Sequence, residues 1–136
     1  MAKLRILITG AGGLLGQALI KTLGESQTVL ASDLMPDPPF ATRVAYQTLD
    51  ICNAEDCKAV VTGFDPAVII NAGAFTHVDK CESERELCWQ VNVRGVENLA
   101  RAARRNMAQL VHLSTDYVFD GKDGPYAEDD PPSPLG

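Results

Sequence analysis

The sequence predicts an α/β fold in which a parallel sheet is covered by helices on both faces. Five short apolar segments recur along the 136 residues, and segments with helical spacing separate most of them. The short segments are apolar throughout rather than alternating with polar residues, which is typical of parallel strands buried on both faces. The length suits one domain, so we expect residues 1–136 to fold around a single sheet.

The predicted strands are short runs rich in β-branched residues. In chain order they are Leu4–Ile8, Thr28–Ser32, Val44–Leu49, Ala67–Asn71 and Gln109–Leu113. Asp33 closes the second strand, and prolines at positions 36, 38 and 39 indicate a loop before the third. A doubly wound sheet built from these strands takes the order 3-2-1-4-5.

Three helices are predicted between the strands. Leu14–Leu23 has apolar residues at helical spacing, and Asn53 is a good N-cap for a second helix that ends near Thr62. A long third helix reaches about Arg105. Two spacings typical of a capping box precede it, Ser83 with Glu86 and Asp79 with Glu82. The chain after the fifth strand is expected to be mostly loop.

The composition excludes several classes of function. Twelve Lys and Arg against eighteen Asp and Glu give a net charge of −6, whereas nucleic-acid binding needs a basic surface. The N-terminus is neither a secretory signal nor a membrane span. The cysteines at 52, 57, 81 and 88 lack the spacing of a zinc or redox motif. We therefore expect reduced structural thiols, no metal site and a cytoplasmic location.

The strongest motif follows the first strand, where Gly10, Gly13 and Gly16 form a G-x-x-G-x-x-G series. Such glycines permit a tight turn, let the main chain approach a pyrophosphate, and allow the helix to pack closely on the sheet. A plain glycine-rich connection is the alternative. The strand–turn–helix context nevertheless predicts a Rossmann-type site for NAD or NADP. The lysine of a P-loop is absent after Gly16, which argues against a nucleoside triphosphatase.

Acidic residues close the second and third strands. Asp33 can accept hydrogen bonds from the adenosine ribose and repels a 2′-phosphate, which favours NAD over NADP. The alternative is a simple turn aspartate. Asp50 and Ile51 are candidate contacts of the adenine, or parts of an ordinary loop that leads into a helix.

Ligands of such sheets bind where the strand order reverses, here between the first and fourth strands. The fourth strand ends in Asn71-Ala72-Gly73-Ala74, whose small residues leave room for the ribose and nicotinamide or simply form a tight strand exit. Thr115, at the end of the fifth strand, could polarise a substrate carbonyl, although a local side-chain-to-backbone turn is the commoner arrangement. Asn92 is a mediocre helix former within the long helix, either exposed or locally bonded.

Together these motifs resemble the extended short-chain dehydrogenases/reductases, and more narrowly the dTDP-4-dehydrorhamnose reductase family. The resemblance covers nearly the whole chain. The matching segments are ITGAGGLLGQAL at 8–19, LDICN at 49–53, NAGAFTHVDKCE at 71–82, VNVRGVENLA at 91–100, STDYVFDG at 114–121 and PYAEDDPPSPLG at 125–136.

The resemblance implies a parent enzyme that uses NADH or NADPH to reduce the C4 ketone of dTDP-4-dehydro-L-rhamnose to dTDP-L-rhamnose. On the cofactor side it implies Gly10, Gly13, Leu14, Leu15, Gly16, Asp33, Asp50, Ile51, Asn71, Ala72, Gly73, Ala74 and Asn92. Thr115 would be the catalytic hydroxyl, and Thr76, Val78 and Tyr117 would lie near the sugar.

The family's reaction also needs a Tyr-x-x-x-Lys pair. None of the three tyrosines, at positions 46, 117 and 126, has a lysine four residues later. We therefore expect residues 1–136 to be an N-terminal NAD(P)-binding fragment that lacks the substrate domain and is inactive alone. The fifth strand would then be an open sheet edge, which leads us to expect a homo-oligomer.

Two alternative functions remain open. Some relatives are non-catalytic regulatory subunits that bind a dinucleotide, such as the β subunit of methionine adenosyltransferase. Others are nucleotide-sugar epimerases or dehydratases. Thr115 and the run VDKCE at 78–82 favour the reductase over the regulatory subunit, and STDYVFDG at 114–121 fits an epimerase or dehydratase less well.

Overall fold

A computed structural model describes residues 2–38 and 43–135, so Pro39 of the predicted loop and the terminal Gly136 lie outside the described residues. The five described strands form one parallel sheet in the order β3-β2-β1-β4-β5, which confirms the predicted doubly wound topology. Their bounds are β1 Arg5–Thr9, β2 Thr28–Asp33, β3 Ala45–Thr48, β4 Val68–Asn71 and β5 Gln109–His112.

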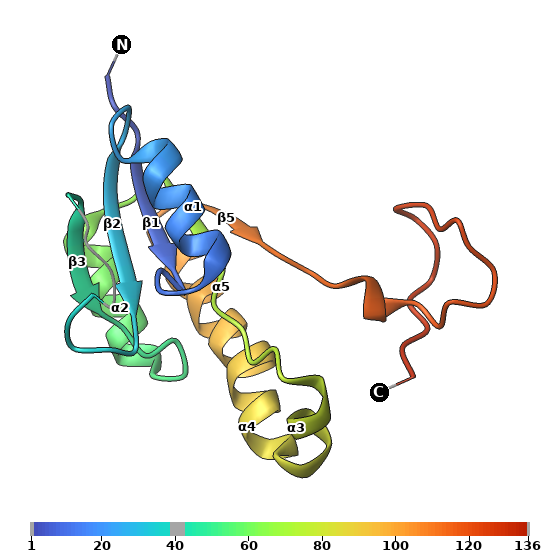
Figure 1. Ribbon diagram of the computed structural model, residues 1–136. Coiled ribbons are helices and arrows are strands. Elements are labelled where there is room, and N and C mark those ends of the chain that lie inside the picture. The colour runs from blue at the N-terminus through green and yellow to red at the C-terminus, as the bar shows by residue number, and fades with distance from the viewer. Residues whose placement is uncertain (1, 39–42, 136) are drawn as a thin grey trace.

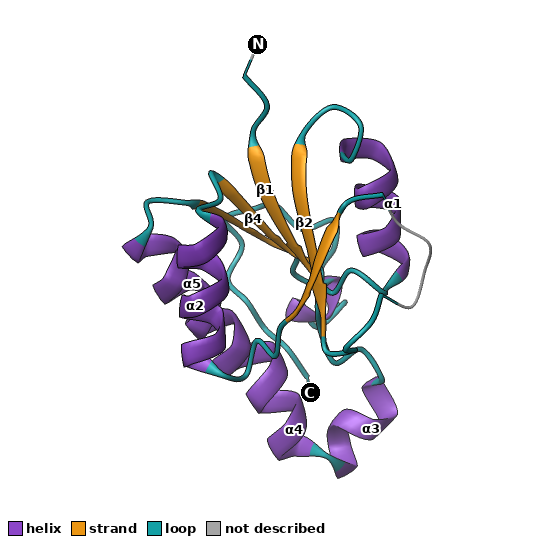
Figure 2. Ribbon diagram, turned by 90° about the vertical axis from the view of Figure 1, so that its left-hand side faces the viewer, coloured by secondary structure: helices purple, strands orange, loops and turns teal. Residues whose placement is uncertain are grey.

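Helices cover the sheet on both faces (Figures 1 and 2). Helix α1 (Leu14–Leu23) packs on one face, and α2 (Ala54–Phe64) and α5 (Val96–Arg105) pack on the other. Each strand sends alternate residues to the two sides. Leu7 belongs to the core beneath α2 and α5, whereas its neighbour Ile8 belongs to the core beneath α1. This two-sided burial explains why the strands are apolar without alternation.

The predicted cap of α2 is confirmed. The Asn53 side chain accepts hydrogen bonds from the amides of Glu55 and Asp56, at 3.0 and 3.2 Å. The helix runs two residues further than predicted, because Gly63 stays helical and the chain turns only at Asp65, in the left-handed conformation (φ 49°).

The long helix predicted to reach about Arg105 is confirmed. It runs without interruption from α4 (Arg85–Trp89) through a π-helical turn, η1 (Gln90–Gly95), into α5, which ends at Arg105. The short helix α3 (Val78–Ser83) precedes it. Neither predicted capping box forms. Glu84, with φ −114° and ψ 47°, interrupts the helical conformation between α3 and α4. The Ser83 hydroxyl donates to Lys80 O and does not cap the following helix.

After β5 the chain leads away from the sheet, as Figure 1 shows. Apart from the short 3-10 helix η2 (Asp116–Val118), this segment is loop, as predicted. It is held by contacts within itself, including the stacked rings of Phe119 and Tyr126 with centroids 4.3 Å apart. No helix among the described residues has the length and apolarity needed to cross a membrane.

Candidate functional site

Two glycines of the predicted motif make main-chain contacts that admit no side chain. Gly10 has φ +69°, and a Cβ on it would lie 2.4 Å from the Gly73 amide nitrogen. A Cβ on Gly16 would lie 2.2 Å from Gly10 O. The turn after β1 therefore packs directly on the exit of β4 on one side and on the first turn of α1 on the other.

Gly13 differs from these two glycines. An added Cβ there would meet only Gly10 O, at 3.4 Å, and Gly13 lines the cleft beside the turn. It also precedes α1 as an N-cap without a side-chain hydrogen bond. The first amides of the helix, including those of Leu14 and Leu15, therefore have no capping side chain, and they carry the positive end of the helix dipole. This arrangement fits an anionic diphosphate.

The cleft is lined by residues from the carboxyl ends of four strands and from η1. They are Thr9, Gly10, Gly13, Asp33, Leu34, Leu49, Asp50, Ile51, Ala72, Gly73, Ala74 and Val91. Eight of these were predicted from the sequence. Thr9, Leu34, Leu49 and Val91 were not, and of them only Thr9, a polar residue closing an apolar strand, carried a sequence signal.

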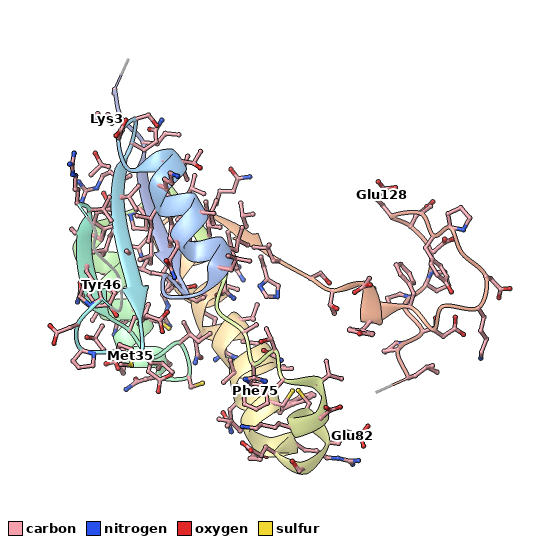
Figure 3. All side chains as sticks on the ribbon, in the orientation of Figure 1. Lys3, Met35, Tyr46, Phe75, Glu82 and Glu128 are labelled. Carbon is pink, nitrogen blue, oxygen red and sulfur yellow. The ribbon has the colours of Figure 1, made fainter. Side chains whose placement is uncertain are left out.

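Asp33 fastens the end of β2 to the glycine turn. Its Oδ2 accepts from the Gly12 amide and its Oδ1 from the Leu34 amide, both at 2.8 Å. The region around Asp33 carries a negative electrostatic potential. Partial burial, followed by the charges of Asp33 and Asp37, raises the pKa of Tyr46, whose hydroxyl donates to Met35 O at 2.7 Å (Figure 3).

Ile51, at the opposite wall of the cleft, is fixed by the helical segment behind it. A Cβ on Gly95 would lie 2.7 Å from Ile51 Cγ1, so η1 approaches as closely as a residue without a side chain allows. The Asn98 amide donates to the carbonyls of Ile51 and Cys52, at 3.0 and 3.1 Å. The adjacent Asp50 carboxylate accepts from the Cys52 amide at 2.8 Å.

A polar row crosses the strand ends beneath the cleft. Thr9, Asn71 and His112 stand in register on β1, β4 and β5. The Thr9 hydroxyl and the Gly73 amide donate to Asn71 Oδ1, at 2.6 and 3.1 Å. Because a backbone amide can only donate, Asn71 must turn its NH₂ group toward His112, where Nδ2 lies 3.1 Å from Nδ1. His112 therefore accepts at Nδ1 and carries its proton on Nε2.

The predicted Asn71 is thus fully buried under the cleft and is absent from its lining. The role of His112 was missed, since the sequence shows it only as a strand residue.

Asn92 lies in η1 and holds the loop that leaves β4. Its Nδ2 donates to Phe75 O at 3.0 Å, and its Oδ1 accepts from the Phe75 amide at 2.9 Å. This two-way bond satisfies both polar groups of one loop residue, directly after the cleft-lining Ala74. The alternative of an exposed asparagine is wrong, because Asn92 is partly buried and bonded across 17 residues.

The remaining predicted residues lie outside the cleft lining. Thr76 is exposed in the loop before α3, and Val78 is exposed at the start of that helix. Thr115 caps η2, where its hydroxyl oxygen accepts from the amide of Tyr117 at 3.2 Å, and Tyr117 is 68% exposed. The structure therefore does not gather these four residues with the glycine turn. Within the described residues, no group of three or more His, Cys, Asp or Glu side chains could hold a metal ion.

Comparison with known proteins gives consistent matches. The family described as the RmlD substrate binding domain matches residues 4–136. A dTDP-4-dehydrorhamnose reductase of Aggregatibacter actinomycetemcomitans is 46% identical over 134 residues. Methionine adenosyltransferase 2 subunit beta of Xenopus tropicalis is 41% identical over 132 residues. The crystal structure of a dTDP-4-dehydrorhamnose reductase from Bacillus anthracis, in complex with NADP, superposes with a TM-score of 0.84 at 38% identity.

These matches cover nearly all of this chain but less than half of each relative. The alignments span 96% of the chain and 42% of the Aggregatibacter protein, 96% and 38% of the Xenopus protein, and 98% and 44% of the Bacillus structure.

The glycine contacts lead to a first prediction. Gly10→Ala should lower the free energy of unfolding by on the order of 3 kcal/mol, since it combines left-handed strain of roughly 1–2 kcal/mol with overpacking of roughly 1–3 kcal/mol. Gly121→Ala is the matched control, because Gly121 also has a positive φ (+76°) but nothing within 4 Å of an added Cβ. Urea unfolding measures both, and equal losses for the two variants would contradict the close approach.

Proposed function

The chain belongs to the RmlD substrate-binding domain family, and we propose that its residues form the dinucleotide-binding part of an NAD(P)-dependent reductase. The observation that carries this proposal is the uncapped start of α1 beside a cleft in which Gly13 has no side chain. That combination suits a diphosphate held by main-chain amides. The 46% identity to a reductase supports the same conclusion.

The dinucleotide would supply a hydride, and the residues of the chain would bind and orient it. We assign the diphosphate to the amides of Leu14 and Leu15, beside the turn that Gly10, Gly13 and Gly16 form. Asp33 would accept hydrogen bonds from the adenosine ribose. Each of its carboxylate oxygens accepts only one hydrogen bond, from the Gly12 or the Leu34 amide, and can accept a second. Asp50 and Ile51 would flank the adenine. Ala72 and Ala74 would leave room for the nicotinamide half, with Asn92 holding the loop behind them.

We further propose that the parent protein reduces the C4 ketone of dTDP-4-dehydro-L-rhamnose. Thr115 would polarise that carbonyl, and Thr76, Val78 and Tyr117 would lie near the sugar. Protonation of the reduced oxygen needs a general acid, which contributes roughly 10²–10⁴-fold. No tyrosine in this sequence has the lysine partner that the family uses. Residues 1–136 should therefore bind the dinucleotide yet turn over slowly by themselves.

Binding can be tested apart from catalysis. The chain should bind NADH, as measured by calorimetry, and Gly13→Val should abolish binding because its side chain would occupy the diphosphate position. The variant should still fold, since an added Cβ there meets only one atom at 3.4 Å. Gly63→Val is the control, because Gly63 lies on α2 and an added Cβ meets nothing within 4 Å. Unchanged binding by a folded Gly13→Val variant would refute the assigned site.

The acidic corner predicts a preference for NADH over NADPH. Two carboxylates, Asp33 and Asp37, lie at the start of the loop after β2, where they would repel a 2′-phosphate. We expect NADH to bind about tenfold more tightly, equivalent to about 1.4 kcal/mol. Asp33→Asn should narrow this ratio, whereas Asp37→Asn, at an exposed position, should change it less. Equal affinities of the wild-type chain for both dinucleotides would contradict the proposal.

A regulatory, non-catalytic role is the second candidate, because the identity to a methionine adenosyltransferase subunit is 41%, close to the value for the reductase. The full-length protein separates the two. The reductase proposal predicts NADH oxidation with formation of dTDP-L-rhamnose when dTDP-4-dehydro-L-rhamnose is added. Absence of turnover together with stable association with a methionine adenosyltransferase would favour the regulatory subunit and overturn the reductase.

A further inference from the structure

Two cysteines outside the cleft lie in direct contact. Cys81 on α3 and Cys88 on α4 have their Sγ atoms 3.1 Å apart, and the Cys88 thiol donates a hydrogen bond to Cys81. Both side chains are partly buried, and neither is in a disulfide. The helices lie beside each other at the carboxyl end of the sheet (Figures 1 and 2).

The sulfurs need move by only about 1 Å to reach the disulfide bond length of about 2.05 Å. The backbone between them can absorb such a shift. Helices α3 and α4 are six and five residues long, and they meet at Glu84, which already has non-helical dihedrals. On a continuous helix a spacing of seven residues would separate the two thiols by two turns, about 10 Å, so the spacing alone does not predict their contact.

We propose that Cys81 and Cys88 form a reversible intramolecular disulfide, a modification site distinct from the dinucleotide cleft. The oxidant is a low-molecular-weight disulfide such as glutathione disulfide. The thiolate of Cys88 attacks one sulfur of the oxidant and expels the first glutathione as a thiolate. The thiolate of Cys81 then attacks Cys88 Sγ and expels the second. The two protein thiols lose two protons and two electrons, which leave as two reduced glutathione molecules.

The contacts indicate that Cys88 reacts first. Asn92 Nδ2 lies 3.5 Å from Cys88 Sγ and can donate to a thiolate there. When Cys88 is ionised, the Cys81 thiol becomes a second donor to it. The same hydrogen bond raises the pKa of Cys81, and partial burial and the charges of Cys88 and Glu84 add to this effect. Thiolate, not thiol, is the attacking species.

Asn92 would connect the disulfide to the loop after β4, part of which lines the cleft. Asn92 touches Cys88 Sγ with the same nitrogen that holds Phe75 O, and Figure 3 places Phe75 between the sheet and the α3–α4 pair. Oxidation turns the Cys88 thiol beside Asn92 into a disulfide sulfur, which is a weaker hydrogen-bond acceptor. Because the bond is partly exposed, a dithiol reductant should reopen it.

The chain itself offers a direct assay. Trypsin cleaves after Lys80, Arg85 and Arg94, which places the two cysteines in separate peptides, 81–85 and 86–94. After treatment with glutathione disulfide and alkylation of the remaining thiols, mass spectrometry should find these peptides linked. The intact mass should be that of one chain less two hydrogen atoms, with no covalent link between chains. Dithiothreitol should restore both alkylation sites.

Three variants sharpen the result. Cys52→Ser should retain the linked peptides, whereas Cys81→Ser and Cys88→Ser should each lose them. Cys57 serves as an internal negative control, because burial raises its pKa to about 12 and keeps it unreactive in the folded chain. A stable glutathione adduct on either cysteine, a link to Cys52, a disulfide-linked dimer, or full alkylation of both thiols would each overturn the proposal.

A second readout needs no digestion. Trp89, the single tryptophan, directly follows Cys88. Its fluorescence should fall when the disulfide forms and recover with dithiothreitol, in wild type and in Cys52→Ser but not in Cys88→Ser. Fluorescence that is unchanged while the two thiols disappear would place the bond elsewhere and contradict the proposal.

Discussion

The described architecture depends on one constraint, the contact of main chain with main chain around Gly10. This residue touches Ala72 and Gly73 at the exit of β4 on one side, and its carbonyl touches Gly16 in the first turn of α1 on the other. The contact fixes where α1 begins relative to the sheet. It also opens the space in which Gly13, Asp33 and the small residues after β4 share one cleft. A side chain at either close approach would separate β1 from β4 or lift α1 from the sheet.

Much of this could be predicted from sequence because the determining signals are local. A β-branched apolar run predicts a buried strand wherever it occurs, and glycines between a strand and a helix have few structural uses. All five strands and their order were therefore predicted correctly, as was the Asn53 cap. Eight of the twelve residues that line the cleft are among those that the sequence places on the cofactor side, since strand ends in a parallel sheet converge on one edge.

The features that escaped prediction depend on partners far away in the sequence. The π-helical turn within the long helix contains Asn92, whose hydrogen bonds to Phe75 a helical pattern cannot reveal. The orientation of Asn71 is set jointly by Thr9, Gly73 and His112, which lie on two other strands and a loop. Cys81 and Cys88 meet only because the chain turns at Glu84. The segment after β5 makes its hydrogen bonds within itself. Thr115 and Tyr117, which the family resemblance places near the substrate, therefore lie apart from the cleft.

We propose that amides at the start of α1 bind the diphosphate of a nicotinamide dinucleotide. The most direct measurement follows the backbone amide resonances of the isotope-labelled chain by nuclear magnetic resonance during titration with NADH. We expect the largest shifts at Gly12, Gly13, Leu14 and Leu15, with smaller shifts along the ends of β2 and β4. Saturable shifts confined to other surfaces, or no shifts at millimolar NADH, would contradict it.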